Sequence, residues 1–66
     1  MHVIVNGESR EVPAETTVAK LLDELKLSGK PVAVEVNLEL APRQHHAQRY
    51  LAEGDRLEIV TLVGGG

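Results

Sequence analysis

The sequence contains no cysteine, no tryptophan and no phenylalanine, and its single aromatic residue is Tyr50. Without cysteine the chain has neither a disulfide framework nor a thiolate metal site, so it must fold on its apolar core alone. It also lacks an excess of positive charge, because 7 Lys and Arg stand against 10 Asp and Glu for a net charge of -3. This balance disfavours nucleic-acid binding through a basic face.

Long apolar runs are missing as well, and the sequence opens without a basic segment followed by an apolar stretch. We therefore expect no membrane span and no secretory signal, and we expect the protein in the cytoplasm. The 66 residues allow one small domain and leave no room for a separate catalytic domain. The content of 42% hydrophobic and 26% charged residues is typical of a folded protein. We expect a folded domain over residues 1–63 and a flexible glycine tail over residues 64–66.

The first segment predicts a β-hairpin. Residues 2–6 are short and rich in β-branched side chains, and the Asn6-Gly7 pair tolerates the positive φ angles of a type I′ turn. The return strand over residues 8–12 is polar enough to lie at a sheet edge. Pro13 has no N–H to donate and should end it.

The period then changes to that of an amphipathic helix. Thr16 or Thr17 supplies an N-cap hydroxyl, Gly29 suits the left-handed position after the helix, and Pro31 cannot continue it. Apolar residues recur at helical spacing on one face, at Val18, Leu21, Leu22 and Leu25.

Alternation with a period of two predicts one strand over residues 32–40. Residues 41–53 indicate an irregular connection that contains a short edge strand or a helical turn. A turn is expected at residues 53–55 and a last strand at residues 56–63. The buried face of the strand over residues 32–40 would carry Val32, Val34, Val36, Leu38 and Leu40.

This order of elements predicts an α+β domain with a mixed sheet of four to five strands packed on one main helix. It is the order of the ubiquitin-like β-grasp fold. By analogy with that fold, the first and last strands should lie side by side in the centre of the sheet.

Internal side chains offer little catalytic chemistry. His45 and His46 are adjacent, so their side chains should point in different directions, and we interpret them as a solvated loop pair and not as a metal site. Ser9 and Ser28 lack a Ser–His–Asp context. We therefore expect no metal site and no internal catalytic group.

The end of the sequence carries the candidate reactive group. The last strand runs into three glycines, so the C-terminal carboxylate of Gly66 would be accessible, and Gly64 and Gly65 would fit a channel too narrow for side chains. Three or four extended residues reach about 10–14 Å. The plain alternative is an idle glycine tail.

The last strand also predicts a surface for a partner. If Leu57 and Ile59 face the core, then Val60 and Leu62 face outward next to Val63. We name Val60, Leu62 and Val63 the docking patch, since exposed apolar residues beside a reactive tail favour a partner that holds it. Isolated surface aliphatics are also common and need no function.

Motifs along nearly the whole chain, in one register, carry a family resemblance. The chain is similar to the ubiquitin-like sulfur-carrier proteins, and within them it resembles the ThiS family of thiamin biosynthesis. The residues that carry the resemblance are Val3-Ile4-Val5-Asn6-Gly7, Thr17-Val18, Leu21-Leu22, Val34-Glu35-Val36-Asn37, Pro42-Arg43, Glu53-Gly54-Asp55 and Val63-Gly64-Gly65-Gly66.

The resemblance implies that the protein is a co-substrate and not an enzyme. An E1-like, ThiF-type enzyme would adenylate the Gly66 carboxylate with ATP, and a sulfur donor such as a cysteine desulfurase would convert it to a thiocarboxylate. A ThiG-type thiazole synthase would then take the sulfur into the thiazole ring of thiamin. No cofactor would be bound. Because the chain has no thiol, a carried sulfur has to sit on its carboxy terminus.

Two other functions use the same fold and tail. The small subunit of molybdopterin synthase is one, although Val60-Thr61-Leu62-Val63 stands where a proline-bearing segment is expected in that protein. A ubiquitin-like modifier or non-covalent binding module is the other. A thiocarboxylate on Gly66 favours a sulfur carrier, whereas an isopeptide bond favours a modifier.

Overall fold

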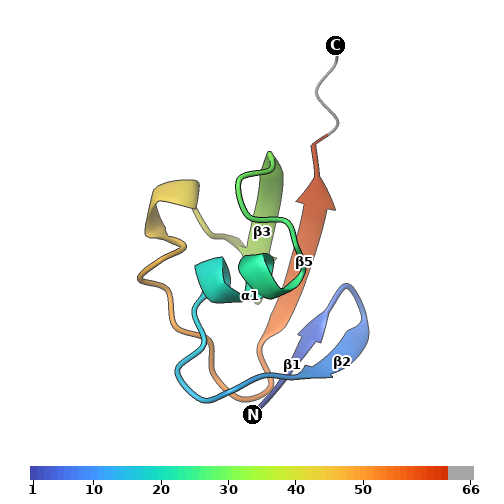
Figure 1. The fold of residues 1–66 in the computed structure, drawn as a ribbon. Coiled ribbons are helices and arrows are strands. Elements are labelled where there is room, and N and C mark those ends of the chain that lie inside the picture. Colours follow the sequence, from blue (N-terminus) through green and yellow to red (C-terminus); the bar gives the residue numbers. More distant parts are fainter. Residues whose placement is uncertain (63–66) are drawn as a thin grey trace.

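The computed structural model of the protein describes residues 1–62. A single α-helix lies against one face of a sheet, and the end of β5 lies at the opposite end of the molecule from Met1 (Figure 1). In chain order the elements are β1 (His2–Val5), β2 (Glu8–Glu11), α1 (Val18–Glu24), β3 (Val32–Val36), β4 (Glu39–Leu40), the 3₁₀ turn η1 (Arg43–His45) and β5 (Arg56–Thr61).

The sheet has five strands in the order β2-β1-β5-β3-β4. β1 pairs with β5 in parallel, while β1–β2, β3–β5 and β3–β4 are antiparallel. The first and last strands are therefore neighbours, and β5 occupies the centre. The predicted β-grasp arrangement of a mixed sheet on one main helix is confirmed.

The β1–β2 hairpin has the predicted turn. Asn6 and Gly7 have φ angles of 50° and 86°, both positive as a type I′ turn requires. β2 is exposed throughout and lies at a sheet edge, as predicted. It ends one residue earlier than expected, although the N–H of the buried Val12 still donates to the Met1 C=O at 2.8 Å.

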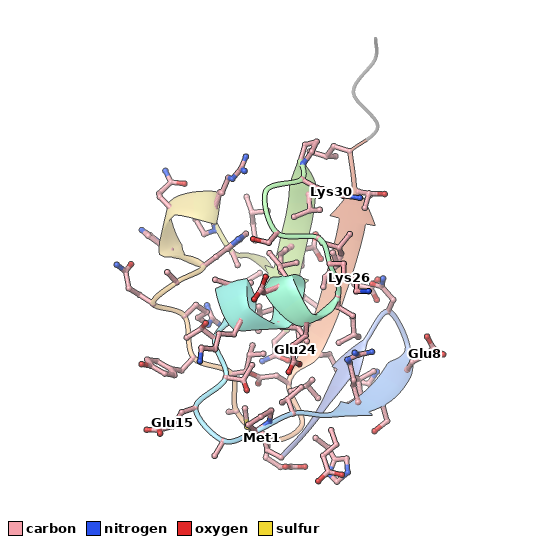
Figure 2. All side chains as sticks on the ribbon, viewed as in Figure 1. Met1, Glu8, Glu15, Glu24, Lys26 and Lys30 are labelled. Atoms are coloured by element: carbon pink, nitrogen blue, oxygen red, sulfur yellow. The ribbon has the colours of Figure 1, made fainter. Side chains whose placement is uncertain are left out.

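Helix α1 begins as predicted and ends differently. Thr17 is the N-cap, and its Oγ1 accepts a hydrogen bond from the Lys20 N–H at 3.1 Å. Lys26 lies just past the end of the helix (Figure 2). It is the left-handed residue there, with a φ of 61°. The prediction that Gly29 fills this position is wrong, because Gly29 has its φ of 78° in a later turn.

Two backbone bonds explain why the helix ends at this lysine. The Lys26 N–H donates to the Asp23 C=O at 3.0 Å, and the Leu27 N–H donates to the Leu22 C=O at 2.8 Å. This pair of bonds is a Schellman motif, which satisfies the last helical carbonyls. Leu27 packs against the core beyond the motif, which offsets the cost of a left-handed residue other than glycine.

The prediction of one strand over residues 32–40 is wrong. β3 and β4 form a hairpin, because Asn37 and Leu38 have φ angles of 52° and 70° and reverse the chain. Leu38 and Leu40 were expected in the core but are 89% and 67% exposed. The apolar alternation therefore continues through the turn without marking a buried face.

The core lies between α1 and the inner face of the sheet. The connection at residues 41–53 contains a helical turn, one of the two predicted options, and Gly54 turns with a φ of 83°. Within residues 1–62, no helix is long and apolar enough to cross a membrane. The buried apolar residues are Val3, Val5, Val12, Val18, Leu21, Leu22, Val34, Val36, Ala41, Leu51, Leu57 and Ile59.

Candidate functional site

The candidate site begins at the end of β5. This strand is described as far as Thr61, and the Leu62 N–H then donates to the Pro31 C=O at 2.8 Å. The predicted strand extends to Val63, which lies outside the described residues. β5 therefore leads from the middle of the sheet toward the candidate tail, paired with β3 as far as Thr61 and bonded to Pro31 at Leu62.

Two members of the docking patch face away from the core. Leu57 and Ile59 are buried beneath α1, so alternation places Val60 on the opposite face. Val60 and Leu62 are 56% and 51% exposed. Their predicted outward position is confirmed, and partner binding remains a prediction.

The surroundings of the patch combine apolar and acidic groups. Val60 lies opposite Ala33 of β3, which extends the apolar surface across the two strands. On the same face of the sheet, two residues before Val60, Glu58 lies opposite Glu35, and both are exposed. Like charges directly opposite one another repel, so a partner with basic groups beside an apolar surface would relieve this repulsion.

The candidate reactive residues continue directly from this patch. Val63, Gly64, Gly65 and Gly66 lie outside the described residues, so their roles remain predictions. Gly66 follows Leu62 by four residues, and a fully extended chain of that length spans at most about 14 Å. A partner that covers Leu62 could therefore place its catalytic site within that distance.

The two histidines do not form a joint site. His45 is exposed, whereas His46 is buried and its Nε2–H donates to the Ala41 C=O at 2.8 Å. Their divergent directions are confirmed, but the interpretation of both as solvated is wrong for His46, which ties the 3₁₀ turn to the chain after β4. Among residues 1–62, no three His, Asp or Glu residues gather as metal ligands.

Two asparagines that sequence reasoning treated only as local features hold β5 in place. The Asn37 Oδ1 accepts from the Arg56 N–H at 3.0 Å, and its Nδ2 donates to the Asp55 Oδ1 at 3.0 Å. The Asn6 amide bonds to the backbone of Ile59, 53 residues away. The only sequence signal was the preference of asparagine for left-handed turns.

Known proteins resemble this chain over its whole length. A thiazole synthase from Paramagnetospirillum magneticum is 47% identical over 66 residues, and the chain spans 20% of that protein's length. The sulfur carrier protein ThiS of Bacillus subtilis is 35% identical over 63 residues, covering 94% of this chain and 96% of that protein.

A solved structure is also similar to this chain. The crystal structure of the thiamine biosynthesis protein ThiS from Geobacter metallireducens matches with a TM-score of 0.84 and 32% identity, covering both chains completely. The sequence profile of the ThiS family matches residues 3–66. The resemblance drawn from the sequence motifs is therefore confirmed, and the chain belongs to the ThiS family.

Proposed function

We propose that this protein is a sulfur carrier of thiamin biosynthesis, activated at the carboxylate of Gly66. The observation that carries the proposal is the ThiS family match, which continues through the terminal glycines to residue 66. A relative matched over nearly its entire length is itself named a sulfur carrier protein. The protein would serve as a co-substrate whose chemistry is performed by its partners.

The chemistry needs an activated carboxylate. A carboxylate is a poor electrophile because oxide would have to leave, but its attack on the α-phosphate of ATP releases pyrophosphate and forms an acyl adenylate. The terminal sulfur of a persulfide on the donor then forms a bond to the Gly66 acyl carbon and displaces AMP. A thiol of a partner protein next attacks the inner sulfur of the resulting acyl disulfide, which forms a disulfide between the partners' sulfurs and releases the Gly66 thiocarboxylate. The resulting thiocarboxylate holds a nucleophilic sulfur. Because the chain has no cysteine, no thiol of its own can attack the Gly66 acyl adenylate in place of the sulfur donor.

The docking patch would supply recognition for an E1-like, ThiF-type enzyme. Val60 and Leu62 offer exposed apolar area at the end of β5, and Val63 continues it toward the tail. Gly64 and Gly65 present no side chains and would thread a narrow channel toward the bound ATP. The acidic pair Glu35 and Glu58 would favour basic groups on the enzyme.

A ThiG-type thiazole synthase is the proposed acceptor of the sulfur. Support comes from the thiazole synthase relative, in which a domain like this one makes up a fifth of a longer chain. A cysteine desulfurase is the proposed sulfur donor. We place these steps in the cytoplasm, where ATP is available for the adenylation.

The intact mass of the protein from its native host tests the proposal. Replacement of one oxygen by sulfur, with one alkylation by a thiol reagent, would locate a thiocarboxylate on the C-terminal carboxyl group, because the chain has no cysteine. A variant with one residue added after Gly66 is the matched control and should not be adenylated. Normal adenylation of that variant would refute the proposal, and isopeptide-linked products would favour a ubiquitin-like modifier.

A further inference from the structure

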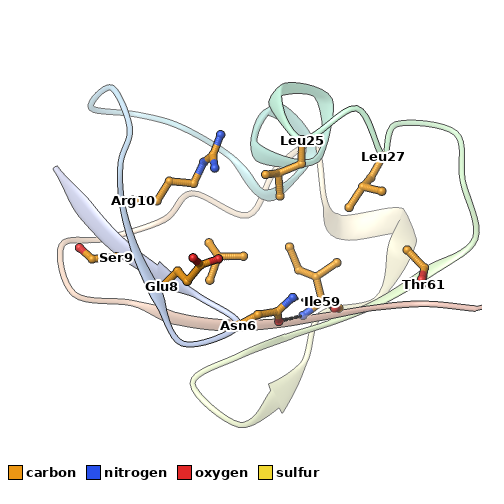
Figure 3. Close-up of a pocket in the computed structure, with 9 residues that line it drawn as sticks. Asn6, Glu8, Ser9, Arg10, Leu25, Leu27, Ile59 and Thr61 are labelled. Atoms are coloured by element: carbon orange, nitrogen blue, oxygen red, sulfur yellow. Dashed lines mark hydrogen bonds between the residues drawn. The ribbon is translucent and has the colours of Figure 1, made fainter.

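The side chain of Asn6 continues the pairing of β1 with β5 after the backbone of β1 has turned away. The Asn6 N–H donates to the Leu57 C=O at 2.9 Å, as in a regular parallel ladder. The next ladder bond would join the Asn6 C=O to the Ile59 N–H, but the Asn6 backbone enters the hairpin turn with a φ of 50°. Instead, the Ile59 N–H donates to the Asn6 Oδ1 at 2.8 Å, and the Asn6 Nδ2 donates to the Ile59 C=O at 3.1 Å (Figure 3).

These two bonds extend the length over which β5 is held on both sides. The backbone register of β1 with β5 covers only the first two residues of β5, whereas β3 pairs with it as far as Thr61. Without the amide, the strand after Leu57 would be hydrogen-bonded on the β3 side alone. With the Asn6 amide, Ile59 becomes the last residue at which β5 is hydrogen-bonded on both sides, and it directly precedes the docking patch.

Beyond Asn6 this edge of β5 faces open space. A hollow of about 450 Å³ lies between the β1–β2 hairpin and the chain after α1, with Leu25, Leu27 and Thr61 among its lining residues (Figure 3). Within residues 1–62, we find no hydrogen bond to this edge of β5 past Ile59. The Asn6 amide is thus the final polar restraint on the β1 side of the strand that leads to the tail.

Asparagine is suited to this position because it combines three properties. It tolerates a left-handed φ, it offers an acceptor for the Ile59 N–H, and it offers a donor for the Ile59 C=O. Aspartate would keep the turn but place a carboxylate against that carbonyl oxygen. Glycine would keep the turn and remove both bonds.

We propose that Asn6 is a positioning residue for the activation of the C-terminal glycine. Its amide holds the end of β5 in one direction, so that the docking patch and the chain after it reach the activating enzyme together. Loss of the amide would leave Val60 and Leu62 unchanged, but the end of the strand would be held only by its hydrogen bonds on the β3 side, so its direction would be less restrained. This inference rests on the sulfur-carrier function proposed above.

Asn37 provides a matched control. It also occupies a hairpin turn with a positive φ of 52°, and its amide also holds β5, but at Arg56, the start of the strand. Asn6→Gly and Asn37→Gly therefore remove the same chemical group from equivalent turns, one bonded to Ile59 and the other to Arg56 at the start of β5. Both variants keep a residue that adopts the turn conformation, so both should fold, which far-ultraviolet circular dichroism checks.

The test has two readouts. Amide hydrogen exchange in the free proteins should be about tenfold or more faster at Ile59 in Asn6→Gly and at Arg56 in Asn37→Gly, because each amide loses its acceptor. Pyrophosphate exchange with ATP, catalysed by the adenylating enzyme of the same organism, should show a KM for Asn6→Gly raised about tenfold with kcat within about twofold. The KM of Asn37→Gly should stay within about twofold of the unsubstituted protein.

Three results would overturn the role of Asn6: unchanged Ile59 exchange, an unchanged KM for Asn6→Gly, or an equal rise in KM for Asn37→Gly. Each leaves the sulfur-carrier function standing as long as the unsubstituted protein supports pyrophosphate exchange. If the unsubstituted protein supports none, the proposed function fails and the positioning role fails with it.

Discussion

Substitution of Leu62 by aspartate should weaken the complex with the adenylating enzyme while leaving the fold intact. Leu62 is 51% exposed, so a partner can bury about half of its side chain. Full burial of a leucine contributes about 1.5–3 kcal/mol, so the lost half is about 1 kcal/mol. A carboxylate buried without a partner costs at least about 1 kcal/mol more. The sum of about 2 kcal/mol corresponds to a Kd raised about 30-fold.

Leu38→Asp is the matched control for this experiment. Leu38 is 89% exposed, and its neighbour Asn37 bonds to Arg56 at the start of β5. The start of β5 lies about 20 Å along the strand from Leu62. The same change of charge there should leave Kd within about twofold. Isothermal titration of the enzyme with each variant gives Kd, and thermal unfolding checks the fold. An unchanged Kd for Leu62→Asp would refute the location of the patch, and an equal loss for Leu38→Asp would refute its specificity.

Three stability predictions follow from the fold, each measured by chemical denaturation with thermal unfolding as a check. Leu21→Ala should cost about 3 kcal/mol, because Leu21 is fully buried, and should remove at least about a third of the roughly 3–10 kcal/mol expected for 66 residues. Leu38→Gly should stabilise by up to about 1 kcal/mol by relieving the left-handed φ of 70°, and a loss of stability would contradict this account of the turn. Thr17→Ala should cost about 1 kcal/mol through loss of the helix cap, whereas Thr17→Ser should cost much less.

The sequence predicts this fold well wherever a local pattern has only one interpretation. The Asn6-Gly7 turn, a threonine cap at Thr16 or Thr17 and the alternation in β5 each depend on neighbouring residues. The structure has all three, with Thr17 as the cap. The β3–β4 turn was missed because its second residue is Leu38, which prolongs the apolar alternation where glycine would have marked a reversal. The end of α1 was misplaced for a similar reason, since Lys26 takes the left-handed position usually given to glycine.

The outward direction of Val60 could be predicted from the sequence, but the hydrogen bonds from Asn6 that hold β5 could not. Burial of Leu57 and Ile59 follows from strand periodicity, and this places Val60 on the outer face. The bonds from Asn6 to Ile59 join residues 53 positions apart, and no local pattern contains them. Contacts of this kind depend on which strands become neighbours, which only the assembled sheet determines.

Because β5 lies in the centre of the sheet, the sheet can assemble only after β5 has been synthesised. Among residues 1–62, β5 is the last strand along the sequence, yet the β1–β2 and β3–β4 hairpins are joined in the sheet only through it. Such long-range pairing forms late, so a chain cut or aborted before Arg56 would be left with two separate hairpins that are marginal on their own. If the proposed activating enzyme recognises the assembled sheet, it should therefore bind only chains that were synthesised past β5.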